Sequence, residues 1–288
     1  ELAHEQQRLN RAHLILGHKD SGLNPDGFNV SIDLAQAEFL PWFELLQQQL
    51  SGNTDAEQPF FPALSLVRGK VARLDMAPGI VLHNTVFELT TLPDSWQLQL
   101  NGTEIASRWS FNKDWQGKGI SAALDYLHLP LSNAVVDVSG LPPAVAELVH
   151  EPQRWLLQLP PIQLTCGDCS LGSYRFGKVN AKAHSDGQQW LLSEFSADYK
   201  RSRLTANGVW LNDNSSAGHS SFSGRLQTAN LGAMLDEFQL TSAISGSSAE
   251  IDFALNWPGA PQQFAPDELA GQVKFNLGEG ALTEVSDQ

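Results

Sequence analysis

The sequence predicts a mostly β protein, an elongated and mostly antiparallel sheet with a few short helices at its joints. Apolar side chains alternate with polar or small ones over the last third of the chain. Short runs of this kind are separated by Gly, Asn, Asp and Pro, and short helical patterns recur after groups of strands. The clearest alternating apolar positions are Ile251, Phe253, Leu255 and Trp257, then Leu269, Gly271, Val273, Phe275 and Leu277. Such a sheet has one apolar face and one polar face.

The individual strands follow from this alternation and from the turn residues between them. Asn101-Gly102 is the strongest hairpin signal and separates Trp96–Leu100 from a return strand that ends near Phe111. The connections are too short for helical crossovers, so we expect antiparallel neighbours. The expected strands are residues 30–33, 96–100, 105–111, 120–129, 135–138, 155–159, 190–199, 202–211, 221–228, 251–257 and 269–277.

Three short helices are expected among these strands. The first lies near residues 34–50 with Asp33 as its N-cap, the second near 141–149, and the third follows Asn230. Their apolar positions at helical spacing are Phe39, Trp42, Phe43 and Leu46; Val145, Leu148 and Val149; and Leu231, Met234, Leu235 and Phe238. The first helix either covers the apolar face or simply packs on the sheet. This repetition suggests a modular β array. We expect two segments of it, residues 1–150 and 151–288.

Composition limits the classes of partner. The chain has 288 residues, 42% apolar, with a net charge of −14. A nucleic-acid partner would need clustered Lys and Arg, so we expect none. No run approaches the roughly 18 apolar residues of a membrane span. Because the chain begins with Glu1 and ends directly after a strand, we expect a piece of a longer protein.

The two cysteines form a Cys166-Gly167-Asp168-Cys169 motif. This spacing is compatible with half of a zinc site, a redox motif or a local disulfide. No second ligand pair of matching spacing is present, so we expect no metal. Gly167-Asp168 resembles a hairpin turn, which favours a structural pair or a disulfide between Cys166 and Cys169.

Sequence motifs for catalysis are absent. No GxSxG, HExxH, P-loop or dinucleotide fingerprint occurs, and the eight histidines are scattered. We therefore expect no catalytic residues, no cofactor and no enzymatic activity. The tryptophans within strands fit two interpretations, the core between two sheets of a sandwich or an apolar trough.

Four motifs in the last third resemble the YhdP branch of the AsmA-like proteins. They are LTANGVW at 204–210, GRL at 224–226 with NLGAML at 230–235, FALNWPGAP at 253–261, and LAGQVKFNLGEG at 269–280. The combination is more specific than any single motif. The resemblance is clear over residues 177–285 and looser at 96–102 and 141–143.

The resemblance implies a fold and a role. Proteins of this family are inner-membrane-anchored envelope proteins of Gram-negative bacteria with a long periplasmic β-groove. The expected fold is accordingly a curved sheet that forms an apolar groove. The implied function is conduction of phospholipids between the inner and outer membranes, which supports the outer-membrane permeability barrier. The implied partners are phospholipid acyl chains and unidentified envelope proteins, with membrane contact through parts outside this chain.

We expect thirteen apolar side chains to line the groove. They are Leu98, Leu100, Trp109, Phe111, Leu204, Trp210, Ile251, Phe253, Leu255, Trp257, Val273, Phe275 and Leu277. The competing hypothesis is a non-catalytic binding or scaffolding module of the envelope, a closed β-sandwich whose apolar faces pack on each other. Two sheets about 10 Å apart would identify the sandwich.

Overall fold

A computed structural model describes residues 11–17, 27–39, 64–77, 80–130, 156–157, 159–212, 218–237, 244–261 and 266–282. The chain divides into two compact units, unit 1 (Glu1–Trp115) and unit 2 (Gln116–Gln288). The boundary expected at residue 150 lies outside the described residues and stays a prediction.

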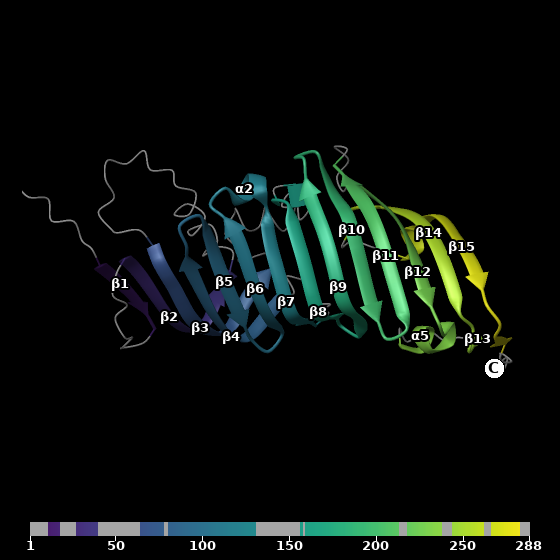
Figure 1. Cartoon of the computed structure of the whole chain (residues 1–288), viewed down its shortest axis with the longest axis horizontal. Coiled ribbons are helices and arrows are strands. Elements are labelled where there is room, and N and C mark those ends of the chain that lie inside the picture. Colours follow the sequence, from purple (N-terminus) through teal and green to yellow (C-terminus); the bar gives the residue numbers. More distant parts are fainter. Residues whose placement is uncertain are drawn as a thin grey trace, which may run out of the picture. The chain divides into compact units, whose positions relative to one another are not determined.

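Unit 1 contains strands that lie side by side in chain order (Figure 1). They are β1 (Arg11–Leu16), β2 (Gly27–Glu38), β3 (Leu64–Ala77), β4 (Ile80–Thr91), β5 (Ser95–Asn101) and β6 (Ile105–Asn112). β1 to β3 pair in parallel, and β3 to β6 pair antiparallel. Helix α2 (Trp115–Lys118) follows at the boundary between the units.

Unit 2 contains a second group of strands, also ordered along the chain. They are β7 (Ile120–Leu129), β8 (Ile162–Leu171), β9 (Tyr174–Ser185), β10 (Gln189–Tyr199), β11 (Ser202–Leu211), β12 (His219–Thr228), β14 (Ala249–Pro258) and β15 (Ala270–Leu277). β7 and β8 pair in parallel and the pairs from β8 to β15 are antiparallel. The smaller elements are α5 (Leu231–Glu237), the 3₁₀ turn η2 (Pro266–Glu268) and the two-residue pair β13 (Ile244–Ser245) and β16 (Ala281–Leu282).

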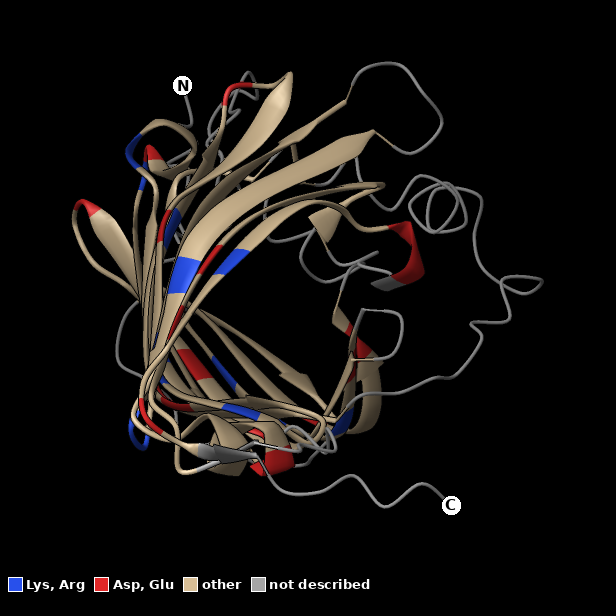
Figure 2. Ribbon diagram, turned by 90° about the vertical axis from the view of Figure 1, so that its right-hand side faces the viewer, with Lys and Arg blue, Asp and Glu red and all other residues tan. Residues whose placement is uncertain are grey.

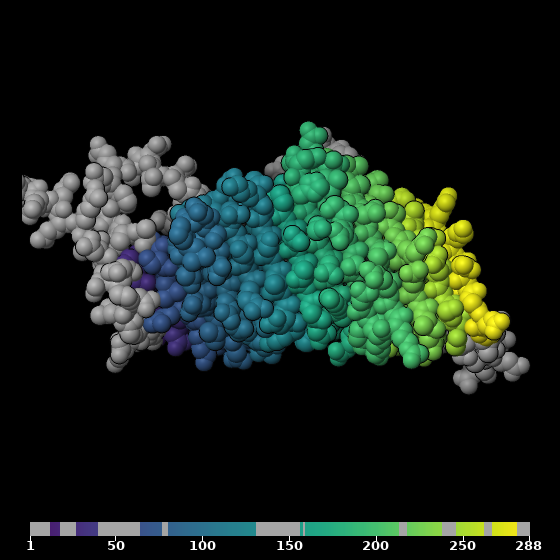
Figure 3. Space-filling model, viewed as in Figure 1, coloured from purple at the N-terminus to yellow at the C-terminus, as the bar shows by residue number. Residues whose placement is uncertain are grey.

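The strands bend along their length, as the end-on view shows (Figure 2). Within unit 2 the strand order begins at β7 and ends at β15, and these two do not pair with each other. The side of the strands turned toward the viewer is filled by side chains and has no deep hollow (Figure 3). The prediction of a mostly β fold with a curved, mostly antiparallel sheet is confirmed, with the parallel pairs in β1–β3 and β7–β8 as the departure.

Register assigns one apolar face to each unit, because residues directly opposite each other on paired strands project from the same side. In unit 1, Val30, Val67 and Leu89 are successive partners from β2 to β4, and Leu98 and Trp109 continue the row. Their neighbours along the strands, such as Arg68, Glu88 and Gln97, face the other side. Alternation in the sequence therefore becomes an apolar and a polar surface.

Three sequence expectations are wrong. Asp33 does not cap a helix, because β2 continues through it to Glu38; the rest of the helix expected near 34–50 lies outside the described residues. Extended pairing with β3 provides β2 with partners for its backbone hydrogen bonds through Glu38. Leu156 and Leu157 are helical, whereas a strand was expected at 155–159. The helix near 141–149 and the strand at 135–138 lie outside the described residues, and the helix after Asn230 is present as α5.

The third wrong expectation is the hairpin turn at Gly167-Asp168. Both residues lie within β8, and the turn to β9 is at Gly172-Ser173. Register with β9 passes from Cys166 opposite Val179 to Cys169 opposite Gly177, so β8 has one more residue than β9 between these pairs and bulges out of the ladder.

Candidate functional site

A continuous apolar surface of unit 2 is built by register between β9 and β15. Each row across the sheet takes one residue from each strand. The row through Phe253 contains Ala181, Phe195, Ala206, Gly224 and Val273, and the next contains Ala183, Leu192, Gly208, Phe222, Leu255 and Gly271. A third row contains Val179, Ala197, Leu204, Leu226, Ile251 and Phe275. We call these three rows the unit 2 apolar face.

Most large side chains of the unit 2 apolar face are partly exposed to solvent. Phe195, Leu204, Phe222, Phe253 and Leu255 all have intermediate exposure. No second layer of described residues buries them, as the second sheet of a sandwich would. On β15, at the end of the strand order, Val273, Phe275 and Leu277 are 44%, 61% and 48% exposed.

A tryptophan cluster bounds the unit 2 apolar face at one end of the strands. Trp210 is 1% exposed and packs with Leu156 and Ala260, and Trp190 joins the cluster. The Pro258–Pro261 corner contributes Ala260 to this cluster. Ser220 Oγ donates a hydrogen bond to the Gly259 carbonyl at 2.8 Å, and the Gly259 amide donates to the Gly218 carbonyl at 2.9 Å.

Helix α5 bounds the face at the opposite strand ends. Asn230 Oδ1 accepts a hydrogen bond from the Ala233 amide at 3.0 Å, which caps the helix. Leu231 and Met234 pack on Ala249, with Leu226 and Ile251 beside them.

An ion pair fastens α5 to the turn between β10 and β11. Lys200 Nζ donates to the Glu237 carboxylate, and this hydrogen bond raises the pKa of Lys200 above its usual value. The three apolar rows therefore lie between two rims, the tryptophan cluster and α5.

The structure places the predicted lining residues in different surroundings. Leu204, Ile251, Phe253, Leu255, Val273 and Phe275 belong to the unit 2 apolar face, and Leu277 extends it on β15. Trp210 and Trp257, 1% and 8% exposed, belong to the rim. Leu98, Leu100, Trp109 and Phe111 are half-buried on the apolar face of unit 1. Their contact with a lipid stays a prediction.

Sequence reasoning missed several members of the face. Phe222 and Leu226 alternate with Ser221, Ser223 and Arg225, a period-two signal that was available in the sequence. Phe195 was harder to find, because the register of β10 shifts after Leu192. This bulge returns Phe195 to the side of Leu192, three residues away, which strict alternation does not predict.

The opposite face of unit 2 is polar and carries cross-strand ion pairs. Arg225 Nε lies 2.6 Å from Asp252 Oδ1 and Arg225 Nη1 lies 3.3 Å from Glu250 Oε1. The hydrogen bond to Asp252, followed by the attraction of both carboxylates, raises the pKa of Arg225. Lys182 and Glu194 form a further pair at 2.7 Å. Such exposed pairs contribute little to stability, but they keep this face polar and hydrated.

Cys166 and Cys169 form a disulfide at the bulge of β8. Both sulfur-bearing residues are buried and face the apolar side, opposite Val179 and Gly177. Gly167 between them lies against β7, where an added β-carbon would be 2.8 Å from the Asp125 carbonyl oxygen. The disulfide therefore links the two residues that flank the bulge of β8.

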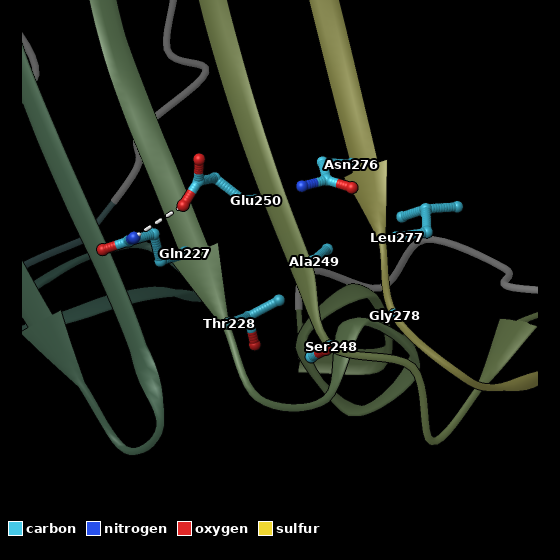
Figure 4. Close-up of a pocket in the computed structure, with 8 residues that line it drawn as sticks. All are labelled: Gln227, Thr228, Ser248, Ala249, Glu250, Asn276, Leu277 and Gly278. Carbon is cyan, nitrogen blue, oxygen red and sulfur yellow. Dashed lines mark hydrogen bonds between the residues drawn. The ribbon is translucent and has the colours of Figure 1, made fainter.

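A pocket of 350 Å³ lies where β12, β14 and β15 end beside α5 (Figure 4). Its lining is Gln227, Thr228, Ser248, Ala249, Glu250, Asn276, Leu277 and Gly278. Gln227 Nε2 donates to Glu250 Oε2 at 2.8 Å across its wall. Ligand pockets are mostly apolar, whereas most of the residues that line this one are polar, so it is a poor site for an acyl chain.

Other kinds of site are not found in the described part of the chain. It contains no group of three or more His, Cys, Asp or Glu side chains placed to hold a metal ion. None of its helices is long and apolar enough to cross a bilayer.

Comparison with known proteins identifies the family. A family model described as "YhdP protein" matches residues 1–288. The chain belongs to the YhdP family. It is also similar to the protein named "Intermembrane phospholipid transporter YhdP" of Escherichia coli (strain K12), with 33% identity over 129 residues. That alignment covers 44% of this chain and only 10% of the relative's length. No solved structure matches the chain.

Proposed function

We propose that the chain is a periplasmic section of a phospholipid transporter, and that the unit 2 apolar face holds acyl chains as they pass between the inner and outer membranes. The observation that carries the proposal is a half-buried apolar face, continuous over β9 to β15, in a member of the YhdP family. Its relative from E. coli is named as a phospholipid transporter.

The physical requirement is a surface that replaces the bilayer interior. Moving an acyl chain into water costs about 0.8 kcal/mol per methylene, or roughly 12 kcal/mol for sixteen carbons. Contact with apolar surface offsets about 25 cal/mol per Å² removed from water. A face made of many half-exposed apolar side chains provides such contact at each step and binds no single position tightly.

The proposed role is passive, and no chemistry is assigned to the face. None of its three rows contains an Asp, Glu, His, Lys or Arg. The described groups with a resolved pKa shift are Asp186, Lys200 and Arg225, all outside these rows. An active site would require titratable groups with shifted pKa values in a cleft, and membership of the YhdP family also points to a transporter rather than an enzyme.

Two further observations support the proposal. The Cys166–Cys169 disulfide suits an oxidising compartment such as the periplasm. The alternative β-sandwich module predicts a second sheet packed on the apolar face, whereas the additional pair found in the described residues, β13 with β16, has two residues per strand. Support of the outer-membrane barrier and contact with the inner membrane through other parts of the protein belong to the same proposal.

The test compares two adjacent substitutions on β14. Phe253→Asp places a carboxylate on the apolar face, and Ala254→Asp places the same group on the exposed polar face. The chain is isolated gently from bacterial envelopes and examined by native mass spectrometry. We expect bound phospholipid in the wild type and in Ala254→Asp, and a large loss in Phe253→Asp. A folded wild-type chain without lipid, or equal lipid in all three, contradicts the proposal.

A further inference from the structure

Gly208 and Phe222 form a closely packed cross-strand pair in the middle of the unit 2 apolar face. They are direct partners on β11 and β12. A β-carbon built on Gly208 would lie 2.3 Å from Cδ1, 2.5 Å from Cγ and 2.7 Å from Cε1 of the Phe222 ring. One edge of the Phe222 ring therefore lies where any other residue at position 208 would place its β-carbon. The ring lies low against the backbone of β11.

Backbone conformation does not explain the glycine. Gly208 is not among the described glycines with a positive φ, so its backbone is open to residues with a β-carbon. All three atoms nearest to the added β-carbon belong to the Phe222 ring. What the glycine provides is the space into which that ring fits.

A second contact holds the ring, with Trp257 on the next strand, β14. Phe222 stacks on Trp257 with ring centroids 5.1 Å apart and an interplanar angle of 19°. Trp257 is 8% exposed, and its Nε1 donates to the Ala260 carbonyl in the Pro258–Pro261 corner at 3.2 Å. The corner therefore fixes Trp257, and Trp257 fixes Phe222 over the glycine.

The same arrangement recurs. Phe253 lies opposite Gly224, where an added β-carbon would be 2.5 Å from the ring Cζ. In unit 1, Phe87 lies opposite Gly69, with a distance of 2.9 Å to the ring Cζ. At Gly224 and Gly69 a backbone carbonyl also approaches within 3 Å of the added atom, so Gly208 is the cleanest example.

We propose that Gly208 is a positioning residue, which keeps the Phe222 ring low so that an acyl chain can pass over it. This inference rests on the proposed function. It adds the feature that determines how much space an acyl chain has above the sheet. A β-carbon at this position would lie within 3.0 Å of three ring atoms, so the ring must move, and the proposal requires that it moves away from the backbone of β11. A raised ring would stand in the path of the acyl chain while the surface stayed apolar.

The experiment measures lipid contact beside the pair. A photoreactive amino acid replaces Leu192, the partner of Gly208 on β10, and the full chain is irradiated with vesicles of phosphatidylethanolamine and phosphatidylglycerol. We expect a lipid adduct in the otherwise wild-type chain and a several-fold loss in Gly208→Ala. Gly208→Ala/Phe222→Ala should regain the adduct, because the obstructing ring is gone. Ser223→Ala, a change on the polar face of β12, should leave the adduct unchanged.

The outcomes separate the inference from the proposed function. Absence of an adduct in the folded wild-type chain overturns the proposed function and this inference with it. An adduct that persists undiminished in Gly208→Ala overturns the inference alone. Failure of Gly208→Ala/Phe222→Ala to regain the adduct also overturns it, because a purely structural need for glycine would then explain the loss. If Gly208→Ala does not fold, Phe222→Trp places a larger ring over the intact glycine and should lower the adduct; an unchanged adduct there overturns the inference.

Discussion

Units 1 and 2 use the same alternating pattern but bury it to different degrees. In unit 1, Val67, Leu89 and Trp96 are 5%, 5% and 4% exposed and form one cluster with Val30 and Ile32. In unit 2, the large side chains at the centre of the three rows stay half-exposed. The pattern of a strand therefore decides which face is apolar, and packing above the strand decides whether that face is a core or a surface.

The two units also differ in where their large aromatic side chains pack. In unit 1, Trp96 and Phe111 pack with ring centroids 5.6 Å apart, and Trp115 joins the same cluster. In unit 2 the tryptophans gather at the rim, and the middle rows contain Gly208 and Gly224 under low aromatic rings. Aromatic rings over glycine occur in both units, since Phe87 lies over Gly69 in unit 1 and packs on its buried cluster. The units therefore differ in where large aromatic side chains gather: within the apolar face in unit 1 and at one end of the strands in unit 2.

Core truncation should separate the two units most strongly. Leu89→Ala in unit 1 should cost about 2–5 kcal/mol of the free energy of unfolding, since it leaves a cavity in a buried cluster. Leu255→Ala on the half-exposed unit 2 apolar face should cost about 1 kcal/mol, because the Leu255 side chain buries less apolar area on folding than the Leu89 side chain does. Urea titration with hydrogen exchange of β4 and β14 measures both. Equal losses would remove the distinction between core and surface.

Loss of the disulfide should have a medium effect that is confined to unit 2. The bond closes a short loop, for which chain entropy gives a stabilisation of about 2 kcal/mol. Cys166→Ser/Cys169→Ser should therefore speed amide exchange in β8 and β9 and leave β3 and β4 unchanged. Equal acceleration in both units would mean that the bond acts beyond its own strand.

The α5 rim should depend on its cap. Asn230→Ala removes the side chain that accepts from the Ala233 amide, and such caps contribute about 1 kcal/mol. Asn207→Ala on the polar face is the matched control, since it removes an exposed hydrogen bond to Ser223. Faster exchange in α5 for Asn230→Ala alone is the expected result. Equal effects of the two variants would contradict the assignment of the cap.

The smallest predicted effect is at the turn between β9 and β10. The amides of Gln188 and Gln189 each donate to Asp186 Oδ1 at 3.0 Å, and these bonds lower the pKa of Asp186 below 3.8. The stabilisation is present above pH 3.8 and is lost as the pH falls through the lower folded pKa. An NMR pH titration of the two amides should give a midpoint below 3.8. A midpoint at or above that value would contradict it.

The sequence predicts the strands better than their connections. β7 and β11 begin and end as the alternation predicts, and β5 ends at Asn101, so that the turn to β6 begins at Gly102. The parallel pairing of β1 to β3 was not predicted, because alternation does not define the direction of a neighbour.

The composition of the apolar face is predictable only in part. Leu204, Phe253 and Leu255 follow from simple alternation, whereas Phe195 reaches the face through a bulge. The role of Gly208 depends on the position of a side chain from another strand. Such contacts between strands have no signature within one strand.

The most direct test of the central claim is site-specific photo-cross-linking in living bacteria at three positions. Leu204 lies on the unit 2 apolar face, Asn207 is exposed on the polar face of the same strand, and Val67 is buried in the core of unit 1. We expect phospholipid adducts at Leu204 and none at Asn207 or Val67. Adducts of equal yield at Leu204 and Asn207, or no adduct at Leu204 in a folded chain, would contradict it.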